Sequence, residues 1–337
     1  MNGPTDAEVT HLPEKSQFSI RMPLLDVRNL TVDYTTPEGA RLRAIEDVSF
    51  TLERGQALGI VGESGCGKTT AMMALMRLLP AAGRVSGGQV LFDGDDMLEL
   101  TAAEFRRRRW LDMAMVFQGA MNALNPVRTV GDQIREAIVT HLTWPRDQVE
   151  RRVGELLDLV GIPPWRAAQY PHQYSGGMRQ RAMIAMALAC KPQLLVADEP
   201  TTALDVMIQA QIINLLDRLR RDLDLALIIV THDLGVVAEA CQQVLVMYGG
   251  QVAEYGPVEH VFTDPRHPYT ERLLRAFPDI GGGRELQSIP GTPPRLSDLP
   301  SGCRFHPRCP LAVERCRSET PALRPVGRDQ MAACHLA

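Results

Sequence analysis

The sequence predicts an α/β fold built around a mostly parallel sheet. Short apolar runs of the kind found in buried parallel strands occur at 57–61, 194–197 and 227–230. Segments with helical spacing lie between them, at 70–79 and 206–219. Strands that alternate with helices are typical of an α/β architecture. With 337 residues, of which 45% are hydrophobic, the chain can also bury a sizeable core.

Composition and charge exclude several other classes of protein. Charged residues make up 23% of the chain, as in ordinary globular domains rather than disordered or collagen-like chains. Lys plus Arg number 36 and Asp plus Glu number 40, so the net charge is −4, which argues against a general nucleic-acid binder. No apolar run approaches the roughly 18 residues of a membrane helix. Residues 1–21 carry charges without an apolar stretch, so we expect a flexible tail rather than a signal peptide, in a reducing cytosol.

The remaining elements follow from alternation and helical spacing. Residues 24–34 alternate apolar and polar side chains and run into the turn-rich 35–39, which predicts a strand and a hairpin. After Phe262, Pro, Gly, Arg and Cys dominate, as expected for a small appended domain. The other predicted elements are strands at 90–92 and 113–117, helical spacing over 130–160 with a break near Trp144, and a small-residue-rich helix at 178–189.

A phosphate-binding loop is predicted directly after the strand at 57–61. The segment 62–69 has the spacing Gly, four residues, Gly-Lys-Thr, and a predicted helix follows it. Glycines let the backbone wrap an anion, while the Lys ammonium and the Thr hydroxyl serve the outer phosphates and Mg²⁺. The predicted contacts are Gly62, Glu63, Ser64, Gly65, Cys66, Gly67, Lys68, Thr69 and Thr70, with Cys66 in a variable position that has no assigned chemistry.

Two carboxylates end the apolar strand at 194–197. Ligands bind at the carboxyl ends of parallel strands, which places Asp198 and Glu199 beside the phosphate loop. Asp198 would hold Mg²⁺ through water, and Glu199 would act as general base on the attacking water. Together with the phosphate loop, the pair predicts a P-loop NTPase.

The segment 174–181, Tyr-Ser-Gly-Gly-Met-Arg-Gln-Arg, resembles the signature motif of the ATP-binding-cassette (ABC) ATPases. Other elements of that family follow the expected order: Gln118 after a strand, Ala-Leu-Asp at 203–205, and His232 after an apolar strand. The resemblance implies that Gln118 contacts Mg²⁺ and water, that His232 holds the γ-phosphate, and that Tyr34 stacks on adenine. It also implies that two cassettes pair head to tail, so that each ATP meets the other subunit's signature and D-loop residues Ser175, Gly176, Gly177 and Asp205.

The family resemblance also implies an architecture. We expect a RecA-like core with an antiparallel β subdomain and an inserted α-helical subdomain at about 119–187, followed by a small cysteine-containing domain. The expected boundaries are a tail at 1–22, the nucleotide-binding domain at 23–262 and a C-terminal extension at 263–337.

A finer resemblance extends over nearly the whole chain. Segments 117–126, 267–270, 289–294 and 302–310 look like the Q-loop region and C-terminal extension of the dipeptide and oligopeptide permease ATPases. This implies an ATPase that energises peptide import from the cytoplasmic face of the membrane. Its partners would be a second and different ATPase subunit, two membrane subunits and an extracytoplasmic binding protein, without nucleic acid. Glutathione, nickel or a metal chelate as cargo, a soluble ABC ATPase acting on nucleic acid or ribosomes, and an exporter are the alternatives.

Four of the seven cysteines lie in the last 35 residues. Cys303, Cys309, Cys316 and Cys334 could form a tetrahedral sulfur site in a reducing compartment, or remain free thiols. The Cys-x-x-Cys pair usual in zinc ribbons is missing, whereas iron–sulfur clusters tolerate looser spacing. In the peptide importers, which the chain resembles, similar cysteines hold a [4Fe–4S] cluster. We therefore expect a structural cluster here, with His306 and His335 as bystanders.

Overall fold

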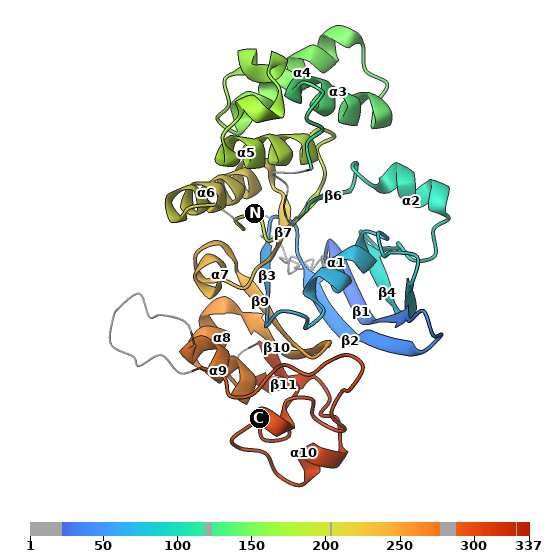
Figure 1. The fold of residues 1–337 in the computed structure, drawn as a ribbon, viewed down its shortest axis with the longest axis vertical. Helices are drawn as coiled ribbons and strands as arrows, with labels where there is room; N and C mark the ends of the chain where they lie inside the picture. Colours follow the sequence, from blue (N-terminus) through green and yellow to red (C-terminus); the bar gives the residue numbers. More distant parts are fainter. Residues whose placement is uncertain (1–21, 118, 120–122, 203, 277–287, 328) are drawn as a thin grey trace, which may run out of the picture.

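Two β-sheets form the framework of this computed structural model, which describes residues 22–117, 119, 123–202, 204–276, 288–327 and 329–337 (Figure 1). Within those residues the larger sheet has eight strands and the smaller has four. The larger sheet runs, in spatial order, through β11 (Arg324–Gly327), β12 (Gln330–Ala332), β10 (Gln251–Pro257), β9 (Gln243–Tyr248), β3 (Ala57–Val61), β8 (Ala226–Val230), β7 (Leu194–Asp198) and β6 (Met113–Val116).

The central strands of the larger sheet are parallel, as the sequence predicts. β3 pairs in parallel with β8 and β9, and β7 pairs in parallel with β6 and β8. Each strand sends alternate side chains into two separate cores: Leu58 and Ile60 of β3 belong to one, and Ala57 and Val61 to the other. Because both faces are covered, every residue of β3, β7 and β8 is buried, and ligands can approach only the strand ends.

The smaller sheet covers one face of the central strands. It contains β2 (Arg41–Leu52), β1 (Leu25–Thr35), β4 (Gly83–Phe92) and β5 (Asp95–Asp96), all antiparallel, with α1 (Lys68–Leu75) and α2 (Ala102–Arg108) nearby. The helix predicted to reach residue 79 is shorter, because Arg77 adopts a left-handed φ of 48°. The Leu78 N–H then donates to the Met73 carbonyl, which closes the helix end.

Helices cover the other face and form a separate lobe at the top of Figure 1. The predicted break near residue 144 is confirmed, because Pro145 caps the second of two helices. Among the described helices, none combines the length and apolar character needed to cross a membrane. The helices of this part of the chain are α3 (Val130–His141), α4 (Arg146–Leu159), α5 (Gly176–Ala187), α6 (Val206–Leu223) and α7 (Leu234–Ala240), with the short η2 (Pro164–Ala168) and η3 (Pro171–Gln173).

The C-terminal segment is built onto the edge of the larger sheet. β12 pairs antiparallel with β10, with Glu254 opposite Ala332 and Tyr255 opposite Met331. Phe305, only 1% exposed, enters the same core cluster as Tyr269. The segment thus shares a sheet and a core with the rest of the chain. Its helices are α8 (Val258–Thr263), α9 (Pro268–Arg275), η4 (His306–Arg308) and α10 (Arg315–Ser318).

Candidate nucleotide site

The phosphate loop predicted from the sequence joins β3 to α1, at the carboxyl edge of the larger sheet (Figure 1). Gly62 has φ +148°, and a Cβ there would lie 2.2 Å from the Met247 carbonyl oxygen. Gly67 has φ +101°, and its Cβ would lie 2.6 Å from Ile45 Cγ2. Gly67 is also the N-cap of α1 and brings no side-chain cap, so no side chain of the cap competes with an anion for the N–H groups of the first helical turn.

Lys68 lies across this loop and is only 8% exposed. Its Nζ donates to the carbonyl oxygens of Gly62 at 2.6 Å and Glu63 at 3.1 Å, and lies 3.7 Å from Cys66 Sγ. The loop carbonyls therefore hold the ammonium where a point charge can meet phosphate oxygens. Burial raises the pKa of the Cys66 thiol, so this cysteine is a packed thiol rather than a nucleophile.

Thr69 and Asp198 form a pair suited to Mg²⁺. The Thr69 hydroxyl lies 3.5 Å from Asp198 Oδ1, and Asp198 ends β7 with 2% of its surface exposed. Burial raises the pKa of Asp198, while the Thr69 hydrogen bond and the Lys68 charge oppose that rise. Hydroxyl and carboxylate oxygens are the protein ligands that Mg²⁺ prefers, and the cation would offset the cost of burying this charge.

Glu199 and His232 come together beside that pair. Glu199 takes a left-handed φ of 46°, and its N–H donates to the Val230 carbonyl at 2.8 Å. Its carboxylate accepts a 2.7 Å hydrogen bond from the Thr202 hydroxyl and lies 3.4 Å from His232 Nδ1. Unusual backbone conformations are often stored at functional sites. Here the turn brings a carboxylate from β7 to an imidazole that follows β8.

The signature residues begin α5, in the helical lobe. Ser175 caps this helix, because its hydroxyl accepts the Met178 N–H at 3.3 Å. Gly176 opens the helix, and Gly177 allows close packing on α6, since a Cβ there would lie 2.7 Å from Ile208 Cγ2. Asp205 caps α6 by accepting the Ile208 N–H at 3.0 Å. These four residues therefore sit at the starts of α5 and α6, whereas Lys68 and Thr69 start α1, Asp198 ends β7, and Glu199 and His232 follow β7 and β8.

Two predicted contacts lie at the margins of this arrangement. Tyr34 is near the end of β1, where its ring covers Gly83 of β4; a Cβ on Gly83 would lie 2.8 Å from the ring. A half-buried ring in this position can offer a flat surface to a base. Gln118 lies outside the described residues.

The four C-terminal cysteines come from three parts of the chain. Cys303 and Cys309 flank η4, Cys316 lies in α10, and Cys334 follows β12. Burial, and to a lesser extent the charges of the other three thiols, raise the pKa of Cys303 to about 11, so the sulfurs lie within electrostatic range of one another. Among the described residues, however, no three His, Cys, Asp or Glu side chains are arranged to hold a metal ion. The expected [4Fe–4S] cluster is thus not supported by this arrangement.

Sequence reasoning missed two residues that reach the phosphate loop from the C-terminal segment. Tyr269 Oη accepts the Glu63 N–H at 2.9 Å, and Arg308 donates to both carboxylate oxygens of Glu63. The sequence separations are 206 and 245 residues, so no local spacing pattern could have indicated these contacts.

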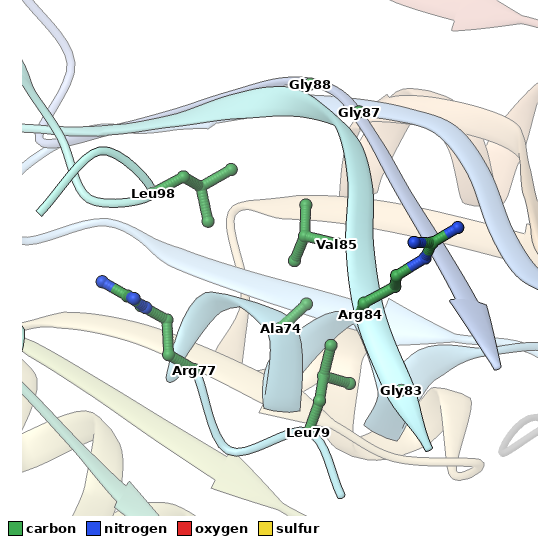
Figure 2. A pocket seen from close by; sticks show the side chains of 9 residues that line it. All are labelled: Ala74, Arg77, Leu79, Gly83, Arg84, Val85, Gly87, Gly88 and Leu98. Carbon is green, nitrogen blue, oxygen red and sulfur yellow. The ribbon is translucent and has the colours of Figure 1, made fainter. Parts of the chain in front are cut away.

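A cavity of about 440 Å³ lies beside Ala74 and Arg77 (Figure 2). This is the C-terminal end of α1, the helix that Lys68 begins. Ala74, Arg77 and Leu79 line one side, and Gly83 and Val85 of β4 line the other. The Arg77 guanidinium already donates to the Leu100 carbonyl at 2.6 Å. None of the residues predicted to bind nucleotide lines this cavity, so the site at the strand ends is a separate place.

Solved structures share the fold of this chain. The ATP-binding cassette MJ0796, in a dimeric post-hydrolysis state bound to ADP and Pi, aligns with a TM-score of 0.62 and 27% identity over 69% of this chain and 98% of that one. CbiO1 from Clostridium perfringens, part of the ABC transporter complex cbiONQ, aligns with a TM-score of 0.62 and 28% identity over 72% of this chain and 91% of that one. The fold predicted from the sequence, a P-loop ABC ATPase, is confirmed.

Sequence comparisons identify the group of ABC proteins to which the chain belongs. The ABC transporter family model matches residues 45–202, and the model of the oligopeptide/dipeptide transporter C-terminal region matches residues 253–316. The oligopeptide transport ATP-binding protein OppD of Haemophilus influenzae is 47% identical over 94% of this chain and 98% of its own length. The dipeptide transport ATP-binding protein DppD of Escherichia coli is 47% identical over 93% of this chain and 97% of its own. The chain therefore belongs to the ABC transporter ATP-binding proteins, in the oligopeptide and dipeptide transporter group.

Proposed function

We propose that this chain binds and hydrolyses ATP to energise the import of dipeptides or oligopeptides. The observation that carries the proposal is that Lys68 and Thr69, at the start of α1, lie close to Asp198, Glu199 and His232, which end or follow β7 and β8. The peptide cargo rests on the relatives, which are named oligopeptide and dipeptide transport ATP-binding proteins. ABC transporter ATP-binding proteins hydrolyse ATP to power transport, so the chain is an ATPase.

Each residue of the site has a distinct part in this proposal. Backbone N–H groups of the phosphate loop and the Lys68 ammonium hold the phosphates, and Glu199 accepts a proton from the attacking water. His232, 3.4 Å from Glu199, keeps the water and the γ-phosphate in line. Mg²⁺, held by Thr69, Asp198 and Gln118, would neutralise charge on the phosphates. The remaining proposed contacts are Tyr34 with adenine, and Ser175, Gly176, Gly177 and Asp205 with the ATP of a second cassette.

The proposal includes an assembly and a division of the chain. A second ATPase subunit, two membrane subunits and an extracytoplasmic peptide-binding protein would complete the importer and hold this chain at the cytoplasmic face of the membrane. Residues 23–262 would form the nucleotide-binding domain, with 119–187 as the helical subdomain and 263–337 as the extension. Co-sedimentation with membranes only when the membrane subunits are expressed would support this assembly, and sedimentation with ribosomes would overturn it.

The chemistry is tested by Glu199→Gln. The amide keeps the shape of the side chain but cannot accept the proton, so we expect ATP binding to persist while kcat falls about 10²- to 10⁴-fold. Steady-state phosphate release and equilibrium binding of ATP measure the two quantities separately. Glu239→Gln, at an exposed position of α7, is the matched control. Turnover at the wild-type rate in Glu199→Gln would remove Glu199 as the base.

We propose in addition that Cys303, Cys309, Cys316 and Cys334 bind an iron–sulfur cluster. The support is the donor set, because four cysteines suit an iron–sulfur cluster and these four act on one another electrostatically. To bind iron, their side chains would have to turn toward one another, since among the described residues they are not arranged to hold a metal ion. A cluster would tie η4, α10 and β12 together. Iron, sulfide and zinc per chain in anaerobically purified protein provide the test: four irons and four sulfides support a cluster, whereas zinc alone or no metal overturns it.

A further inference from the structure

An ion pair joins the phosphate loop to the segment between two of the C-terminal cysteines. Arg308 Nη1 lies 2.6 Å from Glu63 Oε2, and Nη2 lies 3.0 Å from Oε1, so the guanidinium grips both carboxylate oxygens. The side chains are largely shielded, with 6% of Arg308 and 22% of Glu63 exposed. Two-pronged pairs of this kind are stronger and more directional than single contacts, and shielding reduces screening by salt.

Arg308 is itself held from several directions. Its Nε donates to the Pro290 carbonyl at 2.8 Å, and Nη1 also donates to Tyr248 Oη at 3.1 Å. The guanidinium carbon lies 5.7 Å from the centre of the Tyr248 ring. A guanidinium with this many fixed partners is pre-organised, so little rotamer entropy is lost when it pairs with Glu63.

The C-terminal segment therefore binds both the side chain and the backbone of Glu63. Arg308 holds the carboxylate, and Tyr269 Oη of α9 accepts the backbone N–H at 2.9 Å. The same residue positions Lys68, because the Glu63 carbonyl accepts from Lys68 Nζ at 3.1 Å. Any shift of residue 63 moves an anchor of the ammonium that faces the phosphates.

The charge of Glu63 gives the contact a direct consequence for anion binding. Glu63 is the only acidic residue in the segment 62–69, whose backbone is shaped to hold phosphates. An unpaired carboxylate in this loop would repel the nucleotide, because electrostatic energies are large where water is partly excluded. A paired one is neutralised and leaves the loop attractive to an anion.

We propose that Arg308 is a positioning residue for ATP binding: it neutralises Glu63 and fixes the start of the phosphate loop from the C-terminal segment. This rests on the proposed function, in which residues 62–70 bind ATP. The affinity of the cassette for nucleotide then depends on how the segment between Cys303 and Cys309 is folded. By thermodynamic linkage, bound nucleotide stabilises that segment in return.

The test is the affinity of the full-length chain for a non-hydrolysable ATP analogue with Mg²⁺, measured by calorimetric titration. Arg308→Ala leaves Glu63 unpaired, and we expect affinity at least tenfold weaker, because at an effective dielectric of about 20 one uncompensated charge has an effect of that size even about 12 Å from a phosphate charge. Arg308→Ala combined with Glu63→Gln removes the orphaned charge, and its affinity should return to within about threefold of wild type. Arg315→Ala, which breaks an ion pair between the start of α10 and its C-cap Glu319, is the matched control.

Thermal midpoints, recorded for every variant, separate affinity from folding. Wild-type affinity in folded Arg308→Ala overturns the inference, and so does a double variant as weak as the single one. If Arg308→Ala does not fold, Glu63→Gln alone decides. The phosphate contacts proposed for the loop are made by its backbone, which this substitution leaves in place, so loss of the carboxylate charge should leave binding as tight as wild type or tighter. Weaker binding by Glu63→Gln would refute the charge argument. A wild-type chain that binds no ATP analogue would instead overturn the proposed function together with this inference.

Discussion

His267 lies at the start of α9 and couples the C-terminal segment to pH. Its side chain is 4% exposed, and its ring centre lies 5.9 Å from that of Phe305. Nδ1 accepts the Tyr269 N–H at 3.0 Å, which requires that nitrogen to be unprotonated. Burial lowers the pKa of His267 to about 4. We predict that protonation of this histidine favours unfolding and that His267→Asn abolishes the effect.

The magnitude follows from linkage. In the unfolded chain the pKa of histidine is about 6.5. Between that pH and pH 4, His267 is therefore protonated in the unfolded state and mostly neutral in the folded state. Stability is therefore lost as the pH falls from 6.5 towards 4. Between pH 7 and pH 5 the loss from this one group is about 2 kcal/mol. Glu254 accepts the backbone N–H of His267 at 3.0 Å, and burial raises the pKa of this carboxyl. Its protonation at low pH therefore favours the folded state, opposite to the effect of His267.

The variant isolates the histidine from such neighbours. Asparagine can still accept the N–H at the helix start but does not titrate, so it keeps the cap and removes the pH dependence. Urea unfolding of both proteins at pH 7 and pH 5 gives the difference, which should change by about 2 kcal/mol. His172→Asn, at an exposed position, is the control and should show no change. An equal pH dependence in wild type and His267→Asn would refute the reasoning.

Three further changes probe the packing and the phosphate loop. Phe305→Ala empties a site that is 1% exposed and should lower the free energy of unfolding by about 3–5 kcal/mol in urea titration; a loss under 1 kcal/mol would show that the extension does not share the core. Gly62→Ala places a Cβ 2.2 Å from the Met247 carbonyl, so binding of an ATP analogue should vanish, and retained affinity would contradict the loop geometry. Ser175→Ala removes the acceptor of the Met178 N–H and should cost about 1 kcal/mol by the same unfolding assay, whereas an unchanged midpoint would exclude a capping role.

The elements best predicted from the sequence depend on neighbours along the chain. The strand at 57–61 is recognised from its continuous apolar run, and the structure places β3 at Ala57–Val61. The helix expected at 70–79 ends earlier, because Arg77 turns left-handed and its guanidinium reaches the Leu100 carbonyl. A helical pattern in the sequence carries no information about that long-range contact. The helix was therefore predicted correctly, but its C-terminal boundary was wrong.

Strand β12 shows a second limit of prediction from sequence. Residues 330–332 form a strand by pairing with β10 on one side and β11 on the other, and three residues have too little local preference to predict that pairing. The composition after residue 262 indicated an appended segment, but not that this segment completes the larger sheet.

The sequence alone predicted those parts of the candidate site that are contiguous: the phosphate loop, the acidic pair at the end of β7, the signature-like residues at the start of α5 and the histidine after β8. Their chemistry depends on residue type at fixed spacing along a strand–loop–helix unit, which local backbone geometry dictates. Only the tertiary structure decided that Arg308 and Tyr269 hold Glu63, and that His267 is kept neutral. Contacts across more than 200 residues and the burial of a side chain depend on how the whole chain packs, and no local sequence pattern predicts that packing.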